Sequence, residues 1–303
     1  MPKFYGTIYN DRISGSSYSD VMYGGYGDDS LWGGYGNDYL YGGSGSDALY
    51  GGEGADTLSG ETGNDRLFGD NGNDKLYGGR GDDALYGGAG TDWLSGDDGY
   101  DYLNGGSGDD TLAGGLGGDT LFGATGHDRL YGGDGQDWMY GGDGNDWLYG
   151  DMDNDRLEGG AGVDHLYGGS GNDILIGGTG SDIMTGGYGI DTFSFAYEGG
   201  WASPALNGQS DYVYDWNGLE DRVVSADAEH SFAGFGANVN SIEAAAALAT
   251  NLYGTEVANI YIFNEATDRG YLLQDQNDDG VFETGVVFMN AGQQFDFTAA
   301  NLV

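Results

Sequence analysis

The sequence has no cysteine, two prolines and 9 basic residues among 303. The absence of cysteine excludes disulfide bonds and thiolate metal sites. The 9 Lys and Arg residues face 50 Asp and Glu residues, which gives a formal net charge of -41. Nucleic acid and anionic membrane surfaces are therefore poor partners, because both repel such a chain. There is also no run of about 18 apolar residues, so no transmembrane helix is predicted. We expect a cationic partner.

Glycine is abundant instead, with 65 residues, and it follows a strict period of nine. From Gly6 to Ser194 the chain divides into 21 consecutive blocks without insertion or deletion. Position one is glycine, position six is aspartate and position eight is apolar in all 21 blocks. From Gly24 onward, position four is glycine in 18 of 19 blocks, and the exception is Asp153. The repeat is thus Gly-Gly-x-Gly-x-Asp-x-Leu-x.

This pattern predicts an all-β fold. Positions six to nine favour a short strand with one apolar side chain pointing inward, and the glycines favour a tight loop between strands. Two blocks then make one coil of 18 residues, in which each strand pairs with the strand one coil later. We predict a parallel β-roll, a two-sided β-solenoid, over residues 1–194, followed by a small mixed α/β cap over 195–303.

The apolar core of such a roll is too small to fold it. One buried leucine contributes about 1.5–3 kcal/mol, whereas ordering each backbone residue costs about 1–2 kcal/mol. Calcium supplies the missing term, because it binds oxygen ligands and offsets the acidic charge. Position-six aspartates one coil apart, such as Asp29 with Asp47 and Asp38 with Asp56, are expected to share an ion with loop carbonyls. Such pairs set an upper bound of about 19 ions in the repeat, and 19 ions would carry +38 against the -41 of the chain.

The predicted calcium ligands are one aspartate per block, with carbonyl groups of the loop glycines. They are Asp29, Asp38, Asp47, Asp56, Asp65, Asp74, Asp83, Asp92, Asp101, Asp110, Asp119, Asp128, Asp137, Asp146, Asp155, Asp164, Asp173, Asp182 and Asp191, together with Gly27, Gly36 and Gly45.

The blocks from Gly6 to Ser194 resemble the repeats-in-toxin (RTX) nonapeptide, a calcium-binding signature. The resemblance implies a β-roll with calcium between successive loops, disordered in the calcium-poor cytosol and folded after export. The opening from Tyr5 to Ile13 is similar to the start of small RTX proteins, so we do not expect a missing N-terminal catalytic domain. The segment Met1–Gly6 lacks the apolar core of a secretory signal peptide.

Two departures from the repeat matter for calcium. Asp153 stands at a glycine position, where aspartate is one of few residues that tolerate positive φ, and its carboxylate is expected to distort a site or to add a ligand. The first two blocks carry Tyr9 and Tyr18 at position four. We expect these two blocks to bind calcium poorly and to fray or to cap the roll.

Aromatic residues occupy position nine in 12 of the 21 blocks, and further ones occupy position seven. Both positions are predicted to point outward, so that Tyr50, Phe68 and Tyr86 stack on one face. A ladder of this kind stabilises neighbouring strands. The alternatives are a surface for a polysaccharide or cell-surface ligand, or one for self-association. The candidate ligand surface comprises Tyr131, Tyr149, Tyr167, Trp138 and Trp147.

The composition changes after Ser194. Residues 240–252 favour a capped helix, and Tyr261–Phe263, Tyr271–Leu273 and Val286–Phe288 favour strands. The region is similar to the cap that follows RTX repeats, and its end resembles the uncleaved tail read by type I secretion machinery. Asp275, Asn277 and Asp279 match the start of a calcium loop, but position 12 of that loop is Val286 where a glutamate belongs; a polar hairpin turn explains the motif equally well.

No catalytic motif stands out. The three histidines lack zinc spacing, and no nucleophile elbow occurs. His127 and His165 stand at variable repeat positions, where solvated side chains are expected. We therefore predict a non-enzymatic, extracellular calcium-binding protein with a structural, adhesive or surface-binding role. The alternatives are an accessory module of a secreted enzyme and a self-assembling surface-layer protein.

Overall fold

The computed structural model describes residues 1–195 and, as backbone, six further strands between residues 211 and 289. All elements in these parts of the chain are β-strands. No helix in the described residues is long and apolar enough to cross a membrane. The chain divides into two compact units, Met1–Leu157 and Glu158–Val303.

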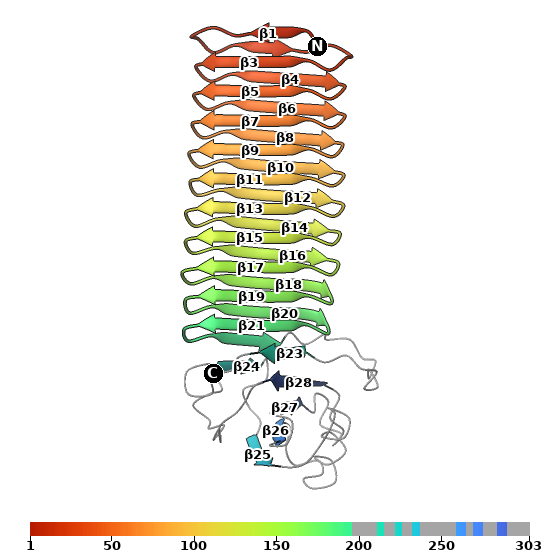
Figure 1. Ribbon diagram of the computed structural model, residues 1–303, viewed down its shortest axis with the longest axis vertical. Coiled ribbons are helices and arrows are strands. Elements are labelled where there is room, and N and C mark those ends of the chain that lie inside the picture. The colour runs from red at the N-terminus through yellow and green to blue at the C-terminus, as the bar shows by residue number, and fades with distance from the viewer. Residues whose placement is uncertain are drawn as a thin grey trace. The chain divides into compact units, whose positions relative to one another are not determined.

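The first unit is built from two parallel sheets (Figure 1). Along the chain, strands alternate between the sheets, and each strand pairs with strands exactly one coil away: Leu85 of one strand aligns with Leu67 and Leu103 of its neighbours. The predicted parallel roll with 18 residues per coil is thereby confirmed. Sheet A contains β1 (Lys3–Tyr5), β3 (Val21–Tyr26), β5 (Tyr39–Ser44), β7 (Thr57–Thr62), β9 (Lys75–Arg80), β11 (Trp93–Asp98), β13 (Thr111–Leu116), β15 (Arg129–Asp134) and β17 (Trp147–Met152). Sheet B contains β2 (Arg12–Ser14), β4 (Ser30–Tyr35), β6 (Ala48–Glu53), β8 (Arg66–Asn71), β10 (Ala84–Ala89), β12 (Tyr102–Ser107), β14 (Thr120–Thr125) and β16 (Trp138–Asp143).

The strands are longer than predicted, and they begin later in the block. They run from position seven through position nine and on to position three of the next block, as β5 (Tyr39–Ser44) shows. The predicted strand at positions six to nine, with the glycines confined to the loop, was therefore wrong. Glycines at positions one and two lie within strands, and only positions four to six form the turn. Position two has positive φ, as at Gly43 (φ 111°), yet it pairs in register with Gly25 of the neighbouring coil. Because every coil repeats the same conformation, the parallel pairing of neighbouring strands continues through position two.

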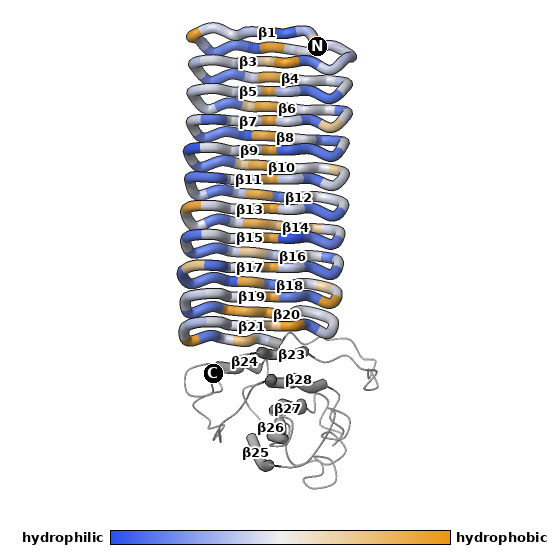
Figure 2. The backbone as a smooth tube through the Cα atoms, in the orientation of Figure 1, coloured by the Kyte–Doolittle hydropathy of each residue, from blue (hydrophilic) through white to orange (hydrophobic). Residues whose placement is uncertain are grey.

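The interior of the roll follows the two-residue alternation of a strand. Positions six, eight and one point inward, so that an aspartate, an apolar residue and a glycine line each coil. The position-eight side chains from Met22 to Phe193 are buried, and so are the position-six aspartates from Asp20 to Asp191. Figure 2 shows the resulting apolar bands in the middle of successive strands. The core is thus an apolar centre with a column of carboxylates at each edge.

The invariant glycine of position one is explained by this packing. A Cβ atom on Gly69 would lie 2.5 Å from both Oδ2 of Asp74 and the carbonyl oxygen of Gly87 in the next coil. No side chain fits between the carboxylate and the adjacent backbone.

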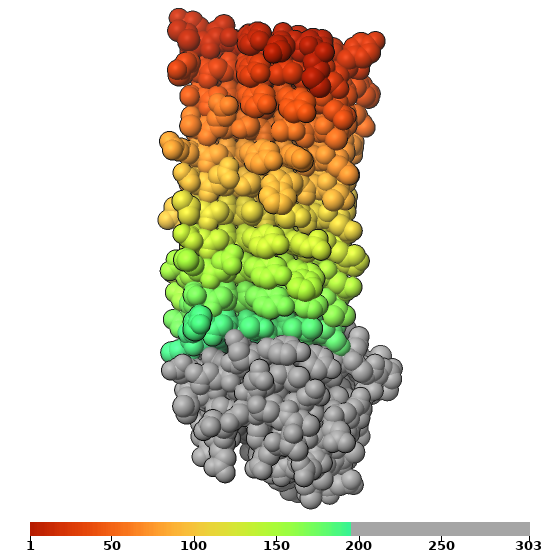
Figure 3. Space-filling view, in the orientation of Figure 1, coloured from red at the N-terminus to blue at the C-terminus, as the bar shows by residue number. Residues whose placement is uncertain are grey.

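The outward faces of the two sheets differ. On sheet B, seven rings form one continuous column, which we call the sheet-B ladder: Trp32, Tyr50, Phe68, Tyr86, Tyr102, Phe122 and Tyr140. The rings from Trp32 to Tyr86 are parallel within 4°, with centroids 4.9–5.6 Å apart, which confirms the predicted stack of Tyr50, Phe68 and Tyr86. Where position nine is Asn104, Tyr102 from position seven fills the gap with a tilted ring. Sheet A has only short stacks, interrupted by small residues such as Ser59 and Ala113. The space-filling view shows the regular rows of side chains on one face of the coils (Figure 3).

The second unit begins with the last repeat strands and continues with non-repeat strands. β23 pairs in parallel with β21, and β24 with β22, so that non-repeat strands extend both sheets. Beyond them, β28 pairs in parallel with β23, while β26, β27 and β28 form an antiparallel meander, which confirms the three predicted strands. The predicted helix at 240–252 lies outside the described residues. The strands are β18 (Arg156–Gly162, which crosses the boundary), β19 (His165–Ser170), β20 (Ile174–Gly180), β21 (Ile183–Tyr188), β22 (Thr192–Phe195), β23 (Asp211–Tyr214), β24 (Arg222–Ser225), β25 (Phe232–Gly236), β26 (Asn259–Asn264), β27 (Arg269–Gln274) and β28 (Thr284–Met289).

Two leucines of β13 offer a matched test of the inward and outward positions. Leu112 is fully buried, whereas Leu116 on the same strand is 52% exposed. We predict that Leu112→Ala lowers the free energy of unfolding in saturating calcium by about 2–5 kcal/mol, because it opens a cavity in a thin core. Leu116→Ala is expected to change it by less than about 0.5 kcal/mol. Urea unfolding followed by circular dichroism measures both; equal effects would contradict the assigned core.

Candidate metal centre

The turn Gly81–Asp83 uses all three of its N–H groups. In the turn Gly81–Asp83, the N–H of Gly81 donates to the carbonyl oxygen of Asp98 (2.8 Å), and the N–H of Asp82 donates to Oδ1 of Asn64 (3.2 Å). The N–H of Asp83 donates to Oδ1 of Asp101 (2.7 Å). All three bonds run along the roll to a neighbouring coil. The turn therefore has no N–H left for a further acceptor.

The position-six aspartates are linked to one another by these bonds. In the first unit, the N–H of each aspartate from Asp11 to Asp137 donates to Oδ1 of the aspartate one coil later, at 2.7–2.9 Å. The second unit contains the same bond from Asp164 to Asp182 and from Asp173 to Asp191. The predicted pairing of aspartates one coil apart is therefore present as a direct backbone-to-carboxylate contact.

The second carboxylate oxygen, Oδ2, has no such partner. It is buried and accepts no hydrogen bond in thirteen consecutive aspartates: Asp29, Asp38, Asp47, Asp56, Asp65, Asp74, Asp83, Asp92, Asp101, Asp110, Asp119, Asp128 and Asp137. A buried polar atom without a partner is costly, and a buried charge more so. A column of such atoms at each edge of the roll requires either protons or cations.

Burial raises the pKa of these carboxyl groups, because it disfavours the charged form. It raises the pKa of Asp74, Asp83 and Asp101 from 3.8 to about 7, against the opposing effect of the backbone hydrogen bond that each carboxylate accepts. Asp56, Asp65 and Asp119 rise to a pKa of about 6 for the same reason. Neighbouring carboxylates one coil away, such as Asp56 beside Asp74, add repulsion that raises the pKa further. Without a cation, ionising the whole column at neutral pH is unfavourable.

The donor set of the turns fits calcium better than other metals. Among the described residues, no three Asp, Glu or His side chains converge as a metal-binding group, so a carboxylate cage or an imidazole site is not formed there. What each turn offers is carboxylate and carbonyl oxygen, the hard ligands that calcium prefers. The carbonyl oxygen of Gly27 lies directly against Gly45 of the next coil, where a side chain would overlap it. The orphaned Oδ2 atoms and these carbonyls belong to the same turns.

Several sequence predictions can now be placed. Gly27, Gly36 and Gly45 have positive φ of 103°, 109° and 132° at position four of their turns. Asp153 adopts positive φ (72°), as its glycine position requires. Asp275, Asn277 and Asp279 lie outside the described residues, although β27 and β28 on either side of them pair in antiparallel fashion, Gln274 opposite Thr284.

Position five, which varies in the sequence, has a structural role as a hydrogen-bond acceptor. Its side chains accept the N–H of the residue one coil later, as Asn37 does from Ala55 and Asn73 from Thr91. His127 takes the same part: its Nδ1 accepts the N–H of Asn145 at 2.9 Å. His127 is exposed, as expected for a solvated side chain, and it accepts this hydrogen bond in addition. The frequent Asn, Asp and Ser residues at position five were the available signal.

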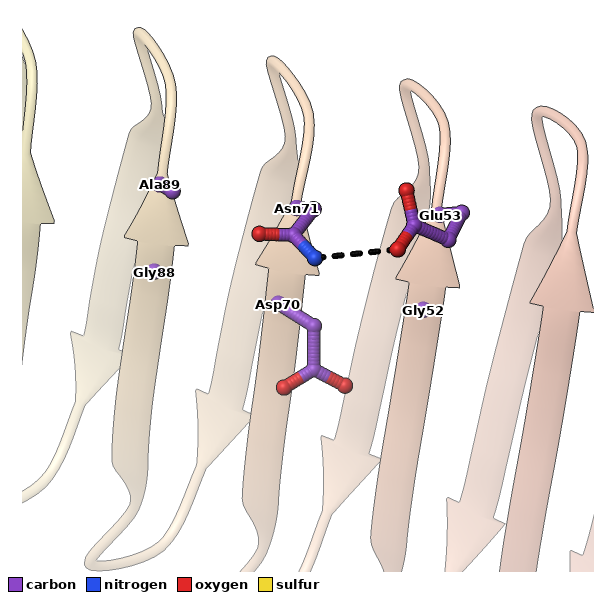
Figure 4. A pocket seen from close by; sticks show the side chains of 6 residues that line it. All are labelled: Gly52, Glu53, Asp70, Asn71, Gly88 and Ala89. Carbon is purple, nitrogen blue, oxygen red and sulfur yellow. Dashed lines mark hydrogen bonds between the residues drawn. The ribbon is translucent and has the colours of Figure 1, made fainter.

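The outward face of sheet B contains one shallow hollow of about 440 Å³. It lies around Asp70, which pairs in register with Gly52 and Gly88 and so stands between two residues without side chains. At its rim, Nδ2 of Asn71 donates to Oε1 of Glu53 at 3.1 Å (Figure 4). The hollow is the space that the two glycines leave beside Asp70.

The predicted ligand surface is divided by the fold. Tyr131, Trp147 and Tyr149 lie together on sheet A: the rings of Tyr131 and Tyr149 stack at 5.1 Å, and Trp147 lies 6.3 Å from Tyr149. Trp138 belongs to β16 of sheet B, on the opposite face. Tyr167 lies on β19 of the second unit. A single surface that contains both Trp138 and Trp147 was therefore a wrong prediction.

The fold and the carboxylate columns together define a calcium-binding repeat protein of the β-roll class. The family model of the RTX calcium-binding nonapeptide repeat matches in eight segments that together cover residues 5–193: 5–34, 14–49, 23–58, 50–85, 59–94, 86–121, 122–157 and 158–193. The chain belongs to this family, as its resemblance to the RTX repeat predicted.

Two solved structures are similar to parts of the chain, and both are solution structures of subunits of the mannuronan C5-epimerase of Azotobacter vinelandii. The AlgE6R3 subunit is 24% identical, with 65% of this chain and 78% of that one covered and a TM-score of 0.33. The AlgE6R2 subunit is also 24% identical, with 63% and 90% covered and a TM-score of 0.31. No curated protein matches the chain.

The raised pKa values of the buried carboxyl groups predict how the metal-free chain responds to pH. The ordinary carboxyl pKa is 3.8, and in the roll the pKa is raised to about 6 for Asp56 and to about 7 for Asp74. Protonation therefore favours the folded state; this stabilisation is complete below pH 3.8 and is lost as the pH rises through 6 to 7. In chelator, we expect the β signal in far-ultraviolet circular dichroism to grow as the pH falls from 8 to 4. A β signal that instead declines on acidification would contradict the burial of these carboxylates.

Proposed function

We propose that this protein is exported unfolded and folds outside the cell when calcium binds between successive turns of its roll, where it serves as a structural or surface-binding module. The observation that carries the proposal is the column of buried Oδ2 atoms from Asp29 to Asp137 that accept no hydrogen bond. Calcium would neutralise this column and join neighbouring coils through the same turns. The cation then supplies the folding free energy that the thin apolar core lacks.

In this proposal the ligands are the position-six aspartates from Asp29 to Asp191, with carbonyl oxygens of turn glycines such as Gly27, Gly36 and Gly45. From Asp29 to Asp137, the hydrogen bond from a backbone N–H to Oδ1 holds each carboxylate in place, which leaves Oδ2 as the oxygen for the ion. The motif at Asp275, Asn277 and Asp279 is a further candidate in the C-terminal region.

The charge of the chain supports the coupling of folding to location. With a net charge of -41, the calcium-poor chain repels itself and stays extended, which suits passage through a transport channel. Higher calcium outside the cell would then fold it. The family is typical of secreted proteins, and the C-terminal region resembles the tail that type I secretion machinery reads. An accessory role beside a separate secreted enzyme, or assembly into a calcium-dependent surface layer, fits the same folding switch.

The assignment of calcium to the position-six aspartates can be tested within one block, with Asp74 as the ligand and Asp70 as the control. Asp74 is buried with an unpartnered Oδ2, whereas Asp70, four residues earlier, is exposed. We predict that Asp74→Asn keeps the acceptor for the N–H of Asp56 but lowers the bound calcium by at least one ion per chain, because the anionic ligand is lost. Asp70→Asn is expected to match the wild type. Equilibrium dialysis with atomic absorption measures the count, and circular dichroism in calcium confirms that each variant is folded.

Calcium titration of the wild type decides the proposal itself. Chelator at pH 8 should give a coil-like spectrum, and added calcium should restore the β signal cooperatively. A β spectrum that persists in chelator at low ionic strength, with no uptake of calcium, would remove the basis for the proposed function.

A second candidate role, retention of a polysaccharide or cell-surface glycan, is favoured by one cluster on sheet A. Tyr131, Trp147 and Tyr149 lie together there, and Arg129 aligns in register with Trp147 on the adjacent strand. The rings of the sheet-B ladder from Trp32 to Tyr86 also stack on one another, as Tyr131 and Tyr149 do, but the sheet-A stack has Trp147 and Arg129 beside it. We call Arg129, Tyr131, Trp147 and Tyr149 the sheet-A cluster.

The two faces provide the matched control for this role. If the sheet-A cluster binds a glycan, Tyr131→Ser with Tyr149→Ser should lower retention on a polysaccharide matrix by at least tenfold, because two ring contacts are lost. Trp138→Ser removes a ring that is 65% exposed on sheet B, and it should leave retention unchanged. Retention assays in saturating calcium distinguish these results. Equal retention by all variants would assign the rings to strand stabilisation alone.

A further inference from the structure

The first two turns of the roll are built differently from all later turns of the first unit. Their position-two residues are Thr7 and Ser16, and their position-four residues are Tyr9 and Tyr18. None of these four residues has positive φ, whereas in the third block Gly25 and Gly27 have φ of 111° and 103°. The strands that precede these two turns, β1 and β2, are also short, with three residues each.

In these two turns, the second carboxylate oxygen of the position-six aspartate accepts hydrogen bonds from the position-two residue. Oδ2 of Asp11 accepts the N–H of Thr7 (2.6 Å) and the Thr7 hydroxyl (2.7 Å). Oδ2 of Asp20 accepts the N–H of Ser16 (2.6 Å) and the Ser16 hydroxyl (2.9 Å). This is the same oxygen that accepts no hydrogen bond in Asp29 and in the twelve aspartates that follow it to Asp137. The difference coincides with the change from Thr or Ser to the positive-φ residues of position two.

Two donors satisfy Oδ2 of Asp11 and of Asp20, the oxygen that is left without a partner in the later turns, without a cation. In each turn, the side-chain hydroxyl and the backbone N–H of one residue both donate to the carboxylate four residues later. The position that stays open for calcium at Oδ2 in the later turns is therefore closed in these two turns. The lone pairs that an ion would use are at the same time occupied.

We infer that the first two turns form a calcium-independent cap and that calcium loading begins at the turns of Asp29 and Asp38, with Thr7 and Ser16 as the residues that decide between the two kinds of turn. This inference rests on the proposed function, because it assumes that the later turns bind calcium. It removes the pairs Asp11–Asp29 and Asp20–Asp38 from the upper bound of 19, which becomes 17.

The cap also positions the first carboxylates of the calcium-loading turns. The N–H of Asp11 donates to Oδ1 of Asp29, and the N–H of Asp20 donates to Oδ1 of Asp38, both at 2.7 Å. Asp29 and Asp38 thus receive the bond that every later aspartate of the first unit receives from the coil before it. For Asp20 that donor would be residue 2, which is Pro2 and has no N–H, and Oδ1 of Asp20 accordingly has no hydrogen-bond partner. The series of hydrogen bonds from a backbone N–H to Oδ1 therefore begins with the N–H groups of Asp11 and Asp20.

The number of bound calcium ions in three full-length variants tests the cap. Thr7→Val with Ser16→Ala removes the two hydroxyls. Thr7→Gly, Tyr9→Gly, Ser16→Gly and Tyr18→Gly together restore the glycine pattern of the later blocks. Ser30→Ala with Thr57→Val is the control, since it removes two hydroxyls from position seven of the strands. Equilibrium dialysis in saturating calcium gives the ions per chain, and hydrogen exchange with mass spectrometry reports on residues 1–20.

We expect the hydroxyl variant to bind as many ions as the wild type and the control, with at least tenfold faster exchange confined to residues 7–20. The four-glycine variant should bind two more ions. A loss of one or two ions in the hydroxyl variant would overturn the inference, and so would a count at or below the wild type in the four-glycine variant. If the wild type itself takes up no calcium, the proposed function fails instead, so the two failures are distinct.

Discussion

The whole roll depends on one contact, a buried carboxylate that receives a single N–H from the coil before it. That contact fixes where the side chain lies, and it leaves the second carboxylate oxygen without a hydrogen-bond donor. Each turn is thus nearly satisfied, and what is missing is positive charge. Because the same deficit recurs along the chain, the stability of the fold becomes a property of the solution around it. A globular protein with a large apolar core has no comparable dependence.

Much of this could be predicted from the sequence, because the repeat is nearly perfect. A period of nine with one inward leucine gives the coil length, the parallel pairing and the aspartate partners, and the structure shows all three. The strand limits could not be predicted in this way. Propensity disfavours glycine in strands, but position two of each coil stacks on an identical conformation in the next coil. That cooperation between coils is invisible to a scale based on single residues.

Two further features, the separation of Trp138 from Trp147 and the role of position five, could have been predicted from patterns in the sequence. Trp138 and Trp147 stand in consecutive blocks, and consecutive blocks belong to opposite sheets, so their separation followed from counting blocks. The acceptors of position five were hidden by their variety, since Asn, Asp, Ser and even His127 perform one task. The ladder on sheet B shows the same tolerance, because Tyr102 replaces a missing ring from a different position. In each case the structure preserves an interaction rather than a residue type.

The alternation of blocks between two sheets has a consequence for how such a chain changes length. Gain or loss of 18 residues leaves every later side chain on its own face, next to the same kinds of neighbours. Gain or loss of nine residues, although it preserves the repeat, moves every later block to the opposite sheet. The seven-ring column on sheet B would then be cut, and its remainder would face the interrupted stacks of sheet A. The heritable unit of this architecture is therefore the coil rather than the nonapeptide.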